Sequence, residues 1–271
     1  MTASVAPQPS ARARALPQFW QFEAPREWQA IDFISDLHLQ AAQPRTLAAF
    51  DAHLRATKAD AVFLLGDVFE AWVGDDARHA GFESGVIEVL QAAAARVSLG
   101  FMAGNRDFLV GAAVLRDCGM VSLADPTLLC AFGHRVLLTH GDALCVDDVD
   151  YQRFRAEVRD PAWQAAFLAR PLAERRALAV RMRDASQQHQ RDQQSAAWSD
   201  VDADIAASWM RAAGTAQMIH GHTHRPGCGE LAPGLRRWVL TDWDLDGEPP
   251  RSGVLRLTAR GLQRLPAAAP A

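Results

Sequence analysis

Several features that define other classes of protein are absent from this chain of 271 residues. No apolar run approaches the roughly 20 residues of a membrane-spanning helix, which excludes an integral span. The net charge of −4 provides no general attraction to nucleic acid or to an anionic membrane. The cysteines include no pair at the two-residue spacing of a structural zinc site, and a chain of this length does not depend on disulfides. We therefore expect reduced thiols in a cytosolic protein, at Cys118, Cys130, Cys145 and Cys228.

The two ends of the chain have compositions typical of segments without stable structure. The first residues are rich in Ala, Pro, Gln and Ser, and no apolar stretch follows Arg12 and Arg14, as it would in a secretory signal. We predict a disordered leader over residues 1–27 and a flexible tail over residues 264–271. Residues 28–263 would then form the catalytic domain.

From residue 30 onward, short apolar runs alternate with helical patterns, and we find no internal repeat. Strands are predicted at Ala30–Ser35, Ala61–Leu65, Ser98–Ala103, Arg135–Thr139, Ala216–His220 and Trp238–Thr241. Helices are predicted at Thr46–Thr57, Gly85–Val97, Leu109–Cys118 and Asp202–Ala213. The alternation favours an α/β fold with helices covering the sheet.

One segment, Tyr151–Ser195, interrupts this alternation because it is long, free of strand patterns and dense in helix formers. Pro161 and Pro171 divide it, so we expect two or three short helices. It contains nine Arg, no Lys and five acidic residues, a net charge of +4. Taken alone, this composition fits an ordinary amphipathic layer with its Arg side chains in solvent. The alternative is a basic and apolar cap beside an active site.

Residues able to bind a metal ion directly follow five of the predicted strands. In open α/β sheets, ligands bind at the carboxyl ends of the strands, so these clusters can converge in space. Neighbouring glycines let the backbone turn sharply and bring a ligand close to an ion. The clusters are Asp36 and His38; Gly66 and Asp67; Gly104, Asn105, Arg106 and Asp107; His140, Gly141 and Asp142; and His220, Gly221, His222, Thr223 and His224.

Each cluster alone has an ordinary explanation, because a Gly-Asp pair after a strand is commonly a turn and a single His is usually just hydrogen-bonded. Five clusters in order, each at a strand end, instead indicate a metal site. Imidazole and carboxylate ligands without a thiolate favour Mn²⁺ or a similar ion. Two such cations would attract a phosphate group and acidify a bound water into a nucleophile.

The clusters resemble the motifs of the calcineurin-like metallophosphoesterase family: Asp-x-His, Gly-Asp, Gly-Asn-x-(Glu or Asp), a His with Gly, and Gly-His-x-His. The resemblance extends from Ile31 to Trp243 and implies a four-layer α-β-β-α sandwich. It also implies that Asp107 and His220 orient the metal ligands from outside. Two divalent cations would share Asp67, with Asp36, His38, Asp67 and His224 around one ion and Asp67, Asn105, His140 and His222 around the other.

Arg106 departs from the wider family, in which a His commonly follows the Asn and can protonate a leaving group. A guanidinium group stays charged and cannot act as a general acid, but it can bind a phosphoryl group through two hydrogen bonds. Loss of the acid would slow the departure of an alkoxide more than that of a phosphate, whose second pKa is about 6. Arg106 therefore favours a diphosphate substrate, cleaved between its two phosphorus atoms.

Longer stretches of the chain resemble the UDP-2,3-diacylglucosamine hydrolases. These stretches are Phe33–Leu39, Leu64–Asp76, Gly104–Leu109, Leu138–Asp148, Tyr151–Arg159, Pro161–Arg176 and Ile219–Pro226. The resemblance implies attack by a metal-bound water on the α-phosphorus of UDP-2,3-diacylglucosamine, giving UMP and 2,3-diacylglucosamine 1-phosphate (lipid X) in lipid A synthesis. It further implies Mn²⁺ and a peripheral position on the cytoplasmic face of the inner membrane. Residues 149–196 would form a helical cap whose apolar side receives the acyl chains.

The same resemblance assigns substrate contacts one residue at a time. Asn105, Arg106 and His222 would contact the substrate at the reacting group, so we place them in the catalytic set. Four further positions would bind substrate: Asp148, Ser186, Gln190 and Gln193. Asp148 has an alternative role as an acid at a helix N-terminus, and Ser186 as a surface residue. In the resembling proteins Asn or Thr is common at the position of Gln190, and Lys is common at the position of Gln193. Arg191 or His189 are alternatives to these two residues.

Other functions compatible with the same motifs are a dinuclear metallophosphoesterase acting on another nucleoside diphosphate derivative, a nuclease, and a binding module that has lost catalysis. Outside the cap we find no basic groove for nucleic acid, and a module without catalysis would be expected to have broken metal motifs. We expect neither a nucleic acid partner nor an obligate protein partner. Trp72 would line a substrate pocket or lie in the core.

Overall fold

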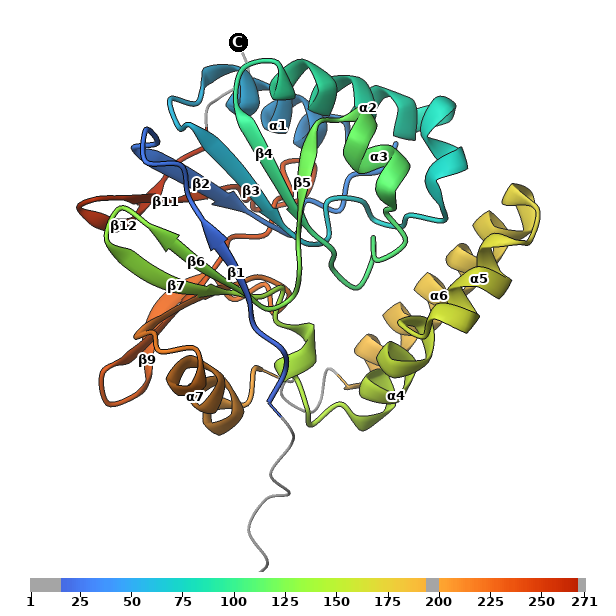
Figure 1. Ribbon diagram of the computed structural model, residues 1–271. Coiled ribbons are helices and arrows are strands. Elements are labelled where there is room, and N and C mark those ends of the chain that lie inside the picture. Colours follow the sequence, from blue (N-terminus) through green and yellow to red (C-terminus); the bar gives the residue numbers. More distant parts are fainter. Residues whose placement is uncertain (1–15, 194–199, 268–271) are drawn as a thin grey trace, which may run out of the picture.

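The computed structural model describes residues 16–193 and 200–267, with the backbone alone described over residues 184–193. Two six-stranded sheets pack face to face, with helices on their outer surfaces (Figure 1). The first sheet contains, in spatial order, β12 (Gly261–Leu265), β11 (Val254–Thr258), β2 (Ala30–Ile34), β3 (Ala61–Leu65), β4 (Ser98–Met102) and β5 (Met120–Leu123). The second contains β1 (Trp20–Glu23), β6 (Thr127–Ala131), β7 (His134–Leu138), β8 (Gln217–His220), β10 (Leu235–Val239) and β9 (Gly227–Ala232).

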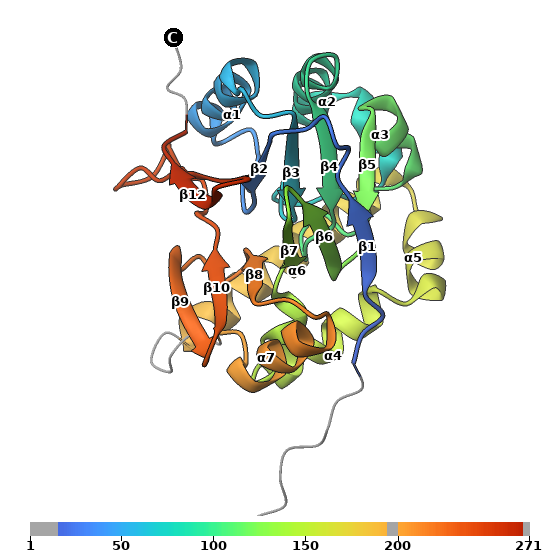
Figure 2. The same ribbon diagram turned by 60° about the vertical axis from the view of Figure 1, so that its left-hand side comes forward.

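Helices complete the two outer layers, as Figure 2 shows with the sheets nearly edge-on. Helices α1 (Pro44–Ala56), α2 (Gly81–Ala94) and α3 (Ala112–Asp117) cover the first sheet, and α7 (Ala203–Ala212) covers the second. Two short 3₁₀ helices, η1 (Asp75–His79) and η2 (Asp142–Leu144), lie in the loops that follow β3 and β7. The expectation of an α/β fold with four layers is confirmed.

The central strands β2, β3 and β4 of the first sheet are mostly apolar because both of their faces are buried. In β3, the side chains of Ala61, Phe63 and Leu65 pack in the cluster between the two sheets. Those of Val62 and Leu64 point the opposite way and pack in the cluster beneath α1 and α2. A third cluster lies between the second sheet and α7. Mostly apolar runs rather than alternating ones therefore identify the strands of the first sheet that carry the site.

Six strands were not predicted: β1, β5, β6, β9, β11 and β12. Strand β1 lies within the segment expected to be a disordered leader, and that prediction is wrong for Trp20–Glu23, which pairs in parallel with β6. The Phe22 ring packs edge to face on Phe63 at 5.3 Å between centroids, so tertiary contacts order a short segment of weak local preference. Strand β12 extends to Leu265, two residues into the expected tail. Residues 16–19 and 24–27 of the expected leader are described beside this strand, whereas residues 1–15 and 268–271 lie outside the described residues.

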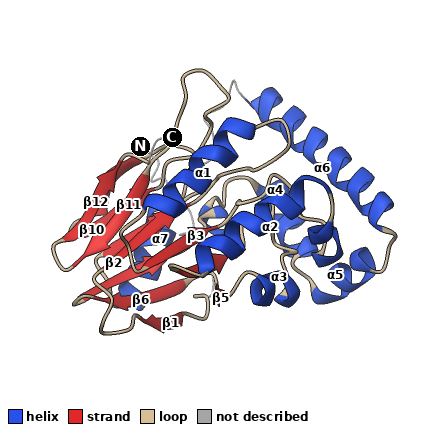
Figure 3. Ribbon diagram, turned by 90° about the horizontal axis from the view of Figure 1, so that it is seen from above, coloured by secondary structure: helices blue, strands red, loops and turns tan. Residues whose placement is uncertain are grey.

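Three helices occupy the segment expected to form a cap, and the last residues of that expectation, 194–196, lie outside the described residues. The helices are α4 (Val149–Val158), α5 (Pro161–Leu168) and α6 (Leu172–Gln193). They project from one side of the sandwich, as Figure 3 shows from above. Breaks occur at the two predicted prolines, since α5 begins at Pro161 and α6 directly after Pro171. The expectation of short helices is wrong for α6, which has 22 residues.

The cap is attached to the sandwich by a buried guanidinium group near the start of α6. Arg175 is 3% exposed and donates hydrogen bonds to the carboxylate of Asp76 and to the carbonyl of Val73, in and before η1. Phe167 of α5 packs into the cluster beneath α1 and α2. Among the described helices, none has the length and apolar character needed to cross a membrane.

A buried carboxylate ties the centre of the first sheet together. Asp32 of β2 is fully buried and accepts hydrogen bonds from Arg256 Nε of β11 at 2.6 Å and from Thr57 Oγ1 at 2.6 Å. His53 Nε2 of α1 lies 3.3 Å from the same carboxylate. Burial opposes ionisation, but the Arg256, His53 and Thr57 contacts outweigh it and lower the pKa of Asp32 to about 2. The ionised form therefore stabilises the fold.

We predict that Asp32→Asn lowers the free energy of unfolding at pH 7 by about 2 kcal/mol, because the variant loses the ion pair with Arg256. The lowered pKa means that the contribution is present above pH of about 4 and is lost as the pH falls towards about 2. Urea unfolding between pH 2 and 7 measures this dependence. Asp51→Asn, which breaks an exposed ion pair with Arg55 on α1, is the control and is expected to cost less than about 0.5 kcal/mol. Equal losses in the two variants would contradict the prediction.

Candidate metal centre

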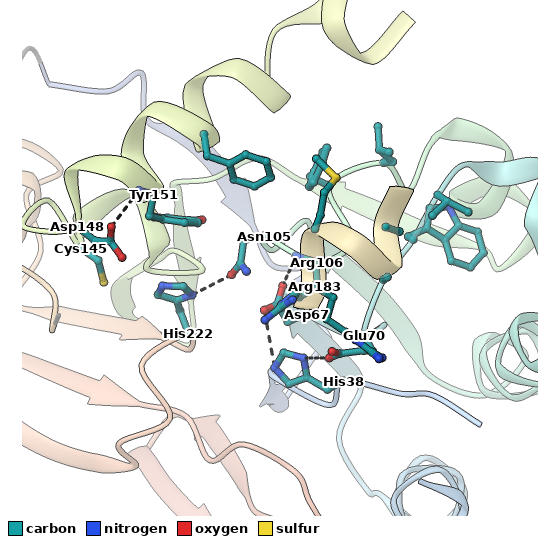
Figure 4. A pocket seen from close by; sticks show the side chains of 18 of the residues that line it. His38, Asp67, Glu70, Asn105, Arg106, Cys145, Asp148, Tyr151, Arg183 and His222 are labelled. Atoms are coloured by element: carbon teal, nitrogen blue, oxygen red, sulfur yellow. Dashed lines mark hydrogen bonds and ion pairs between the residues drawn. The ribbon is translucent and has the colours of Figure 1, made fainter. Parts of the chain in front are cut away.

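The five polar clusters meet where the carboxyl ends of strands from both sheets face the cap. One set follows β2, β3 and β4 of the first sheet, and the other follows β7 and β8 of the second. The close view in Figure 4 shows His38 and Asp67 on one side, and His222 and Asn105 beside the first cap helix. The sandwich therefore brings together residues that are up to 188 positions apart in the chain.

Two groups of ligand atoms are close enough to share an ion. The side chains of Asp36, His38 and His224 form the first group, with ligand atoms all within 4.8 Å of one another. Within this group the Nε2 atoms of the two histidines are 3.3 Å apart, and His224 Nε2 is 3.5 Å from Asp36 Oδ1. The second group is formed by Asp67, His140 and His222 under the same distance limit.

Asp67 and Asn105 connect the groups. Asp67 Oδ2 is 3.8 Å from His38 Nε2 of the first group and 3.6 Å from His140 Nε2 of the second. Asn105 Oδ1 is 2.9 Å from both His140 Nε2 and His222 Nδ1. All seven side chains predicted as ligands thus lie together, in an arrangement with Asp67 between the two groups.

The backbone of these residues is strained. Among the described residues, six that are not glycine have positive φ, and five of them are predicted ligands. Such angles are uncommon outside glycine and persist only where the surrounding structure holds them. The five are Asp36 (53°), His38 (47°), Asp67 (55°), His222 (64°) and His224 (50°). Strain concentrated at one edge of the sandwich is typical of a functional site.

Two positions near the site require glycine because a neighbouring carboxylate leaves no room for a Cβ atom. A Cβ atom at Gly104 would lie 2.1 Å from Asp67 Oδ1. A Cβ atom at Gly221 would lie 2.3 Å from Asp36 Oδ2. Any larger residue at either position would displace a carboxylate of the site.

Partners behind the site orient the imidazole rings. His38 Nδ1 is 2.9 Å from Glu70 Oε2, and His140 Nδ1 is 2.9 Å from the carbonyl oxygen of Leu65. An N–H that donates to these acceptors leaves each Nε2 unprotonated and turned towards the site. Glu70 was missed by sequence reasoning, and its only signal was its place inside the stretch Leu64–Asp76. Burial opposes ionisation of Glu70, but the His38 contact outweighs it and the pKa lies below its usual value.

Asp107 has the outer position expected from the sequence. It is fully buried, and its carboxylate accepts the backbone N–H groups of Gly104 at 2.8 Å and Val68 at 2.7 Å. It thereby joins the loops after β3 and β4, which carry Asp67 and Asn105. Burial, followed by the nearby charge of Asp67, raises the pKa of Asp107 to about 6.

The electrostatics of the site favour a cation. His140 is fully buried, which disfavours its charged form, yet the carboxylates of Asp67 and Asp36 raise its pKa to about 9. The same carboxylates would favour a divalent ion in place of that proton. Burial, followed by the charge of His140, lowers the pKa of His222 to about 4, which favours the neutral ring that a metal ion requires of a ligand. The donor set of imidazole nitrogens and carboxylate or amide oxygens, without a thiolate, fits divalent metal ions.

A cavity of about 610 Å³ extends from these ligands to the underside of the cap. His38, Asp67, Asn105 and Arg106 line its polar end. Aromatic and aliphatic side chains of the cap and of the neighbouring loops line the other end, among them Trp72, Phe108, Leu109, Phe154, Trp163, Phe167 and Met182. Trp72 is both pocket-lining and only 3% exposed, so its two proposed roles are compatible.

The predicted substrate residues differ in what the structure describes. Arg106 and Asp148 line the cavity, and Asp148 also accepts the backbone N–H of Tyr151 at 3.0 Å as the N-cap of α4. The backbone of α6 carries the other three positions, and their side chains lie outside the described residues: Ser186, Gln190 and Gln193. Arg183, one turn before Ser186, lines the cavity and was not predicted.

The chain is similar to known proteins over most of its length. A model of the calcineurin-like phosphoesterase family matches residues 30–226. A protein of Xanthomonas oryzae pv. oryzae named UDP-2,3-diacylglucosamine hydrolase is 43% identical over 242 residues, covering 85% of this chain and 96% of its own length. A protein of the same name from Chromobacterium violaceum is 43% identical, with 88% and 98% covered.

Among solved structures, one from a study of an archaeal phosphodiesterase aligns with 88% of this chain and 99% of its own, at 12% identity and a TM-score of 0.46. The family match covers more than half of the chain and includes all seven predicted ligands. The chain therefore belongs to the calcineurin-like phosphoesterase family.

Proposed function

We propose that this protein hydrolyses UDP-2,3-diacylglucosamine to UMP and 2,3-diacylglucosamine 1-phosphate, a step of lipid A synthesis. The observation that carries the proposal is one cavity with two unlike ends. The side chains able to bind metal ions lie at one end together with Arg106, and the other end is apolar. A nucleotide-linked lipid needs both environments at once. The name shared by relatives 43% identical over most of the chain supports the same substrate.

Two divalent cations, Mn²⁺ by preference, would be held by the two groups of side chains, with Asp67 between them. Asp36, His38 and His224 would complete the first site, and Asn105, His140 and His222 the second. When bound, the cations would neutralise the diphosphate and supply an acidified water for attack on the α-phosphorus. Glu70, Leu65 and Asp107 hold His38, His140 and the ligand loops in place from behind.

Arg106 would bind the diphosphate at the polar end of the cavity. Its backbone N–H donates to Asp67 Oδ1 at 2.8 Å, so its position is tied to the carboxylate between the two groups. A guanidinium group cannot donate its proton to a leaving group at accessible pH. Because the leaving group here is a sugar phosphate rather than an alkoxide, no proton donor is required. Asn105 and His222 would contact the same phosphate from the second group.

The apolar end of the cavity would hold the acyl chains. Trp163 and Phe167 stack at 5.0 Å between ring centroids and face the cavity together with Phe108 and Met182. Burial of each methylene of an acyl chain against these rings is worth about 0.8 kcal/mol. Asp148, and Ser186, Gln190 and Gln193 on α6, would bind the nucleotide and sugar.

The outer surface of the cap suits contact with a lipid bilayer. Three large apolar side chains of the cap are exposed to solvent: Leu168 at 42%, Val180 at 50% and Val149 at 53%. The cap sequence also carries an excess of Arg, which would face anionic lipid headgroups. We therefore propose a cytoplasmic protein peripherally bound to the inner membrane, where its lipid substrate resides.

Purified protein stripped of metal is expected to release no UMP from UDP-2,3-diacylglucosamine, and addition of Mn²⁺ is expected to start the reaction. Chromatographic detection of UMP with and without Mn²⁺ measures this. UDP-glucose, which lacks acyl chains, is the control and should be turned over far more slowly. Comparable turnover of UDP-glucose would favour a phosphoesterase of other nucleoside diphosphate derivatives, and no UMP under any condition would refute the proposal.

Arg106→Gln is expected to lower kcat/KM by about 100-fold, and Arg106→Lys by about 10-fold, because the paired hydrogen bonds to phosphate are lost but the charge survives in the second variant. Steady-state kinetics on the lipid substrate give these values. Arg116→Gln, which alters a side chain 72% exposed on α3, should behave as wild type. If the wild-type protein hydrolyses an alkyl phosphomonoester as fast as the diphosphate, the argument from Arg106 fails.

The double change Leu168→Asp with Val180→Asp is expected to reduce sedimentation of the protein with vesicles of anionic phospholipid by at least about fivefold, because it removes exposed apolar area and adds negative charge. Val121→Asp changes a residue of β5 with 50% exposure outside the cap and serves as the matched control. Equal sedimentation of the two variants would contradict membrane contact through the cap.

A further inference from the structure

One face of helix α4 is directed at the metal centre rather than at solvent. Tyr151, Arg155 and Arg159, the last directly after the end of the helix, are spaced by four residues and therefore lie along one side. All three reach Asp142 of η2. Its Oδ2 accepts the Tyr151 hydroxyl at 2.7 Å and Arg155 Nε at 2.8 Å, and lies 3.7 Å from Arg159 Nη2.

Asp142 is a fixed point for this helix. It is fully buried and lies two residues after His140, on the loop that follows β7. Gln152 of α4 adds a second attachment, since its Nε2 donates to the carbonyl oxygens of Asp142 at 2.8 Å and Cys145 at 3.1 Å. A buried carboxylate surrounded by two guanidinium groups and a hydroxyl holds its partners in one geometry.

The ring of Tyr151 lies over His222 of the second metal group. The two ring centroids are 5.9 Å apart and the planes are inclined by 29°, a stacked arrangement. Figure 4 shows the Tyr151 ring directly beside His222, on the side of the cap. His38 and His140 are oriented by hydrogen bonds to Glu70 and Leu65. Tyr151 lies against the face of the His222 ring, where it would restrict the orientation of that ring as these hydrogen bonds do for His38 and His140.

The C-terminal end of the helix also supports the loop that carries Asn105. Arg159 Nη2 donates to the carbonyl oxygen of Gly104 at 2.9 Å, and its guanidinium carbon lies 5.8 Å from the centroid of the Phe108 ring. Helix α4 and Arg159 at its end therefore contact His222 and Gly104, the residue before Asn105. His222 Nδ1 and Asn105 Oδ1 are 2.9 Å apart. Asn105 and His222 are two of the four ligands proposed for the second cation.

We propose that Tyr151 is a positioning residue for His222, held in place by Asp142, and that α4 thereby sets the affinity of the second metal site. The inference rests on the proposed metal centre but not on the identity of the substrate. It makes the first cap helix part of the wall of the metal site as well as a cover for the cavity. Loss of the ring would free His222 to rotate away from Asn105.

Metal binding to the stripped protein tests this without substrate. Calorimetric titration with Mn²⁺ is expected to give two sites in the wild type. In Tyr151→Leu one of the two affinities should fall by about 10–100-fold, the usual effect of losing a group that orients a metal ligand. Tyr151→Phe keeps the ring and should fall less. Glu157→Gln, on an exposed position of the same helix, is the control and should match the wild type.

Tyr151 is the only tyrosine of the chain, so biosynthetic 3-fluorotyrosine provides a single ¹⁹F resonance that needs no assignment. Saturation with Zn²⁺ is expected to shift this resonance in the wild type and in Glu157→Gln. The shift should disappear in His222→Ala, which removes the stacked ligand, and decrease in Asp142→Asn, which loosens the ring. This spectrum decides the matter if Tyr151→Leu does not fold.

Wild-type affinities for both ions in folded Tyr151→Leu would overturn the inference, as would a resonance insensitive to metal in the wild-type protein. Both measurements are independent of UMP release. A protein that binds two ions as described but releases no UMP would therefore refute the proposed substrate and leave the role of Tyr151 standing.

Discussion

Apolar packing between the two sheets is the interaction on which the rest of this molecule depends. Ile31, Phe33 and Phe63 of the first sheet pack against Val136 and Ile219 of the second, and all are almost fully buried. This contact sets the separation and the alignment of strand ends that belong to different sheets. Carboxylates that follow β2 and β3 meet imidazoles that follow β7 and β8 only because this layer is densely packed.

The site uses the rigidity of that layer. Holding Asp36, His38 and Asp67 at positive φ is unfavourable for each residue, and the cost is offset by the packing around them. Hydrogen bonds then restrict the motion of the ligand side chains and loops. Glu70 contacts His38, and Asp107 joins the loops that carry Asp67 and Asn105. A site built from strand ends and supported in this way can hold side chains at the short spacing that two cations need.

The cap adds the second property of the proposed function. Its side chains give the cavity aromatic surface, and others, such as Val180, are exposed to solvent. The cap is not an independent cover, because Arg175 fastens α6 to η1 and Asp142 fastens α4 to the loop after β7. The residues that would receive the lipid are thus connected to those that would bind the metal.

Local patterns in the sequence were sufficient for the five strands that the polar clusters follow and for the division of the cap at Pro161 and Pro171, and the resemblance of short motifs to a known family supplied the seven proposed ligands. Buried parallel strands are continuous apolar runs, and the motifs of the ligands are short and contiguous. Edge strands such as Trp20–Glu23 have no such pattern, since their order comes from pairing with β6 and from contact with Phe63.

Glu70 and Tyr151 were missed for a related reason. The sequence by itself determined which residues can bind metal, whereas only the tertiary structure decided which groups hold them in place. That second choice depends on contacts between segments far apart in the chain, such as Glu70 with His38 and Tyr151 with His222.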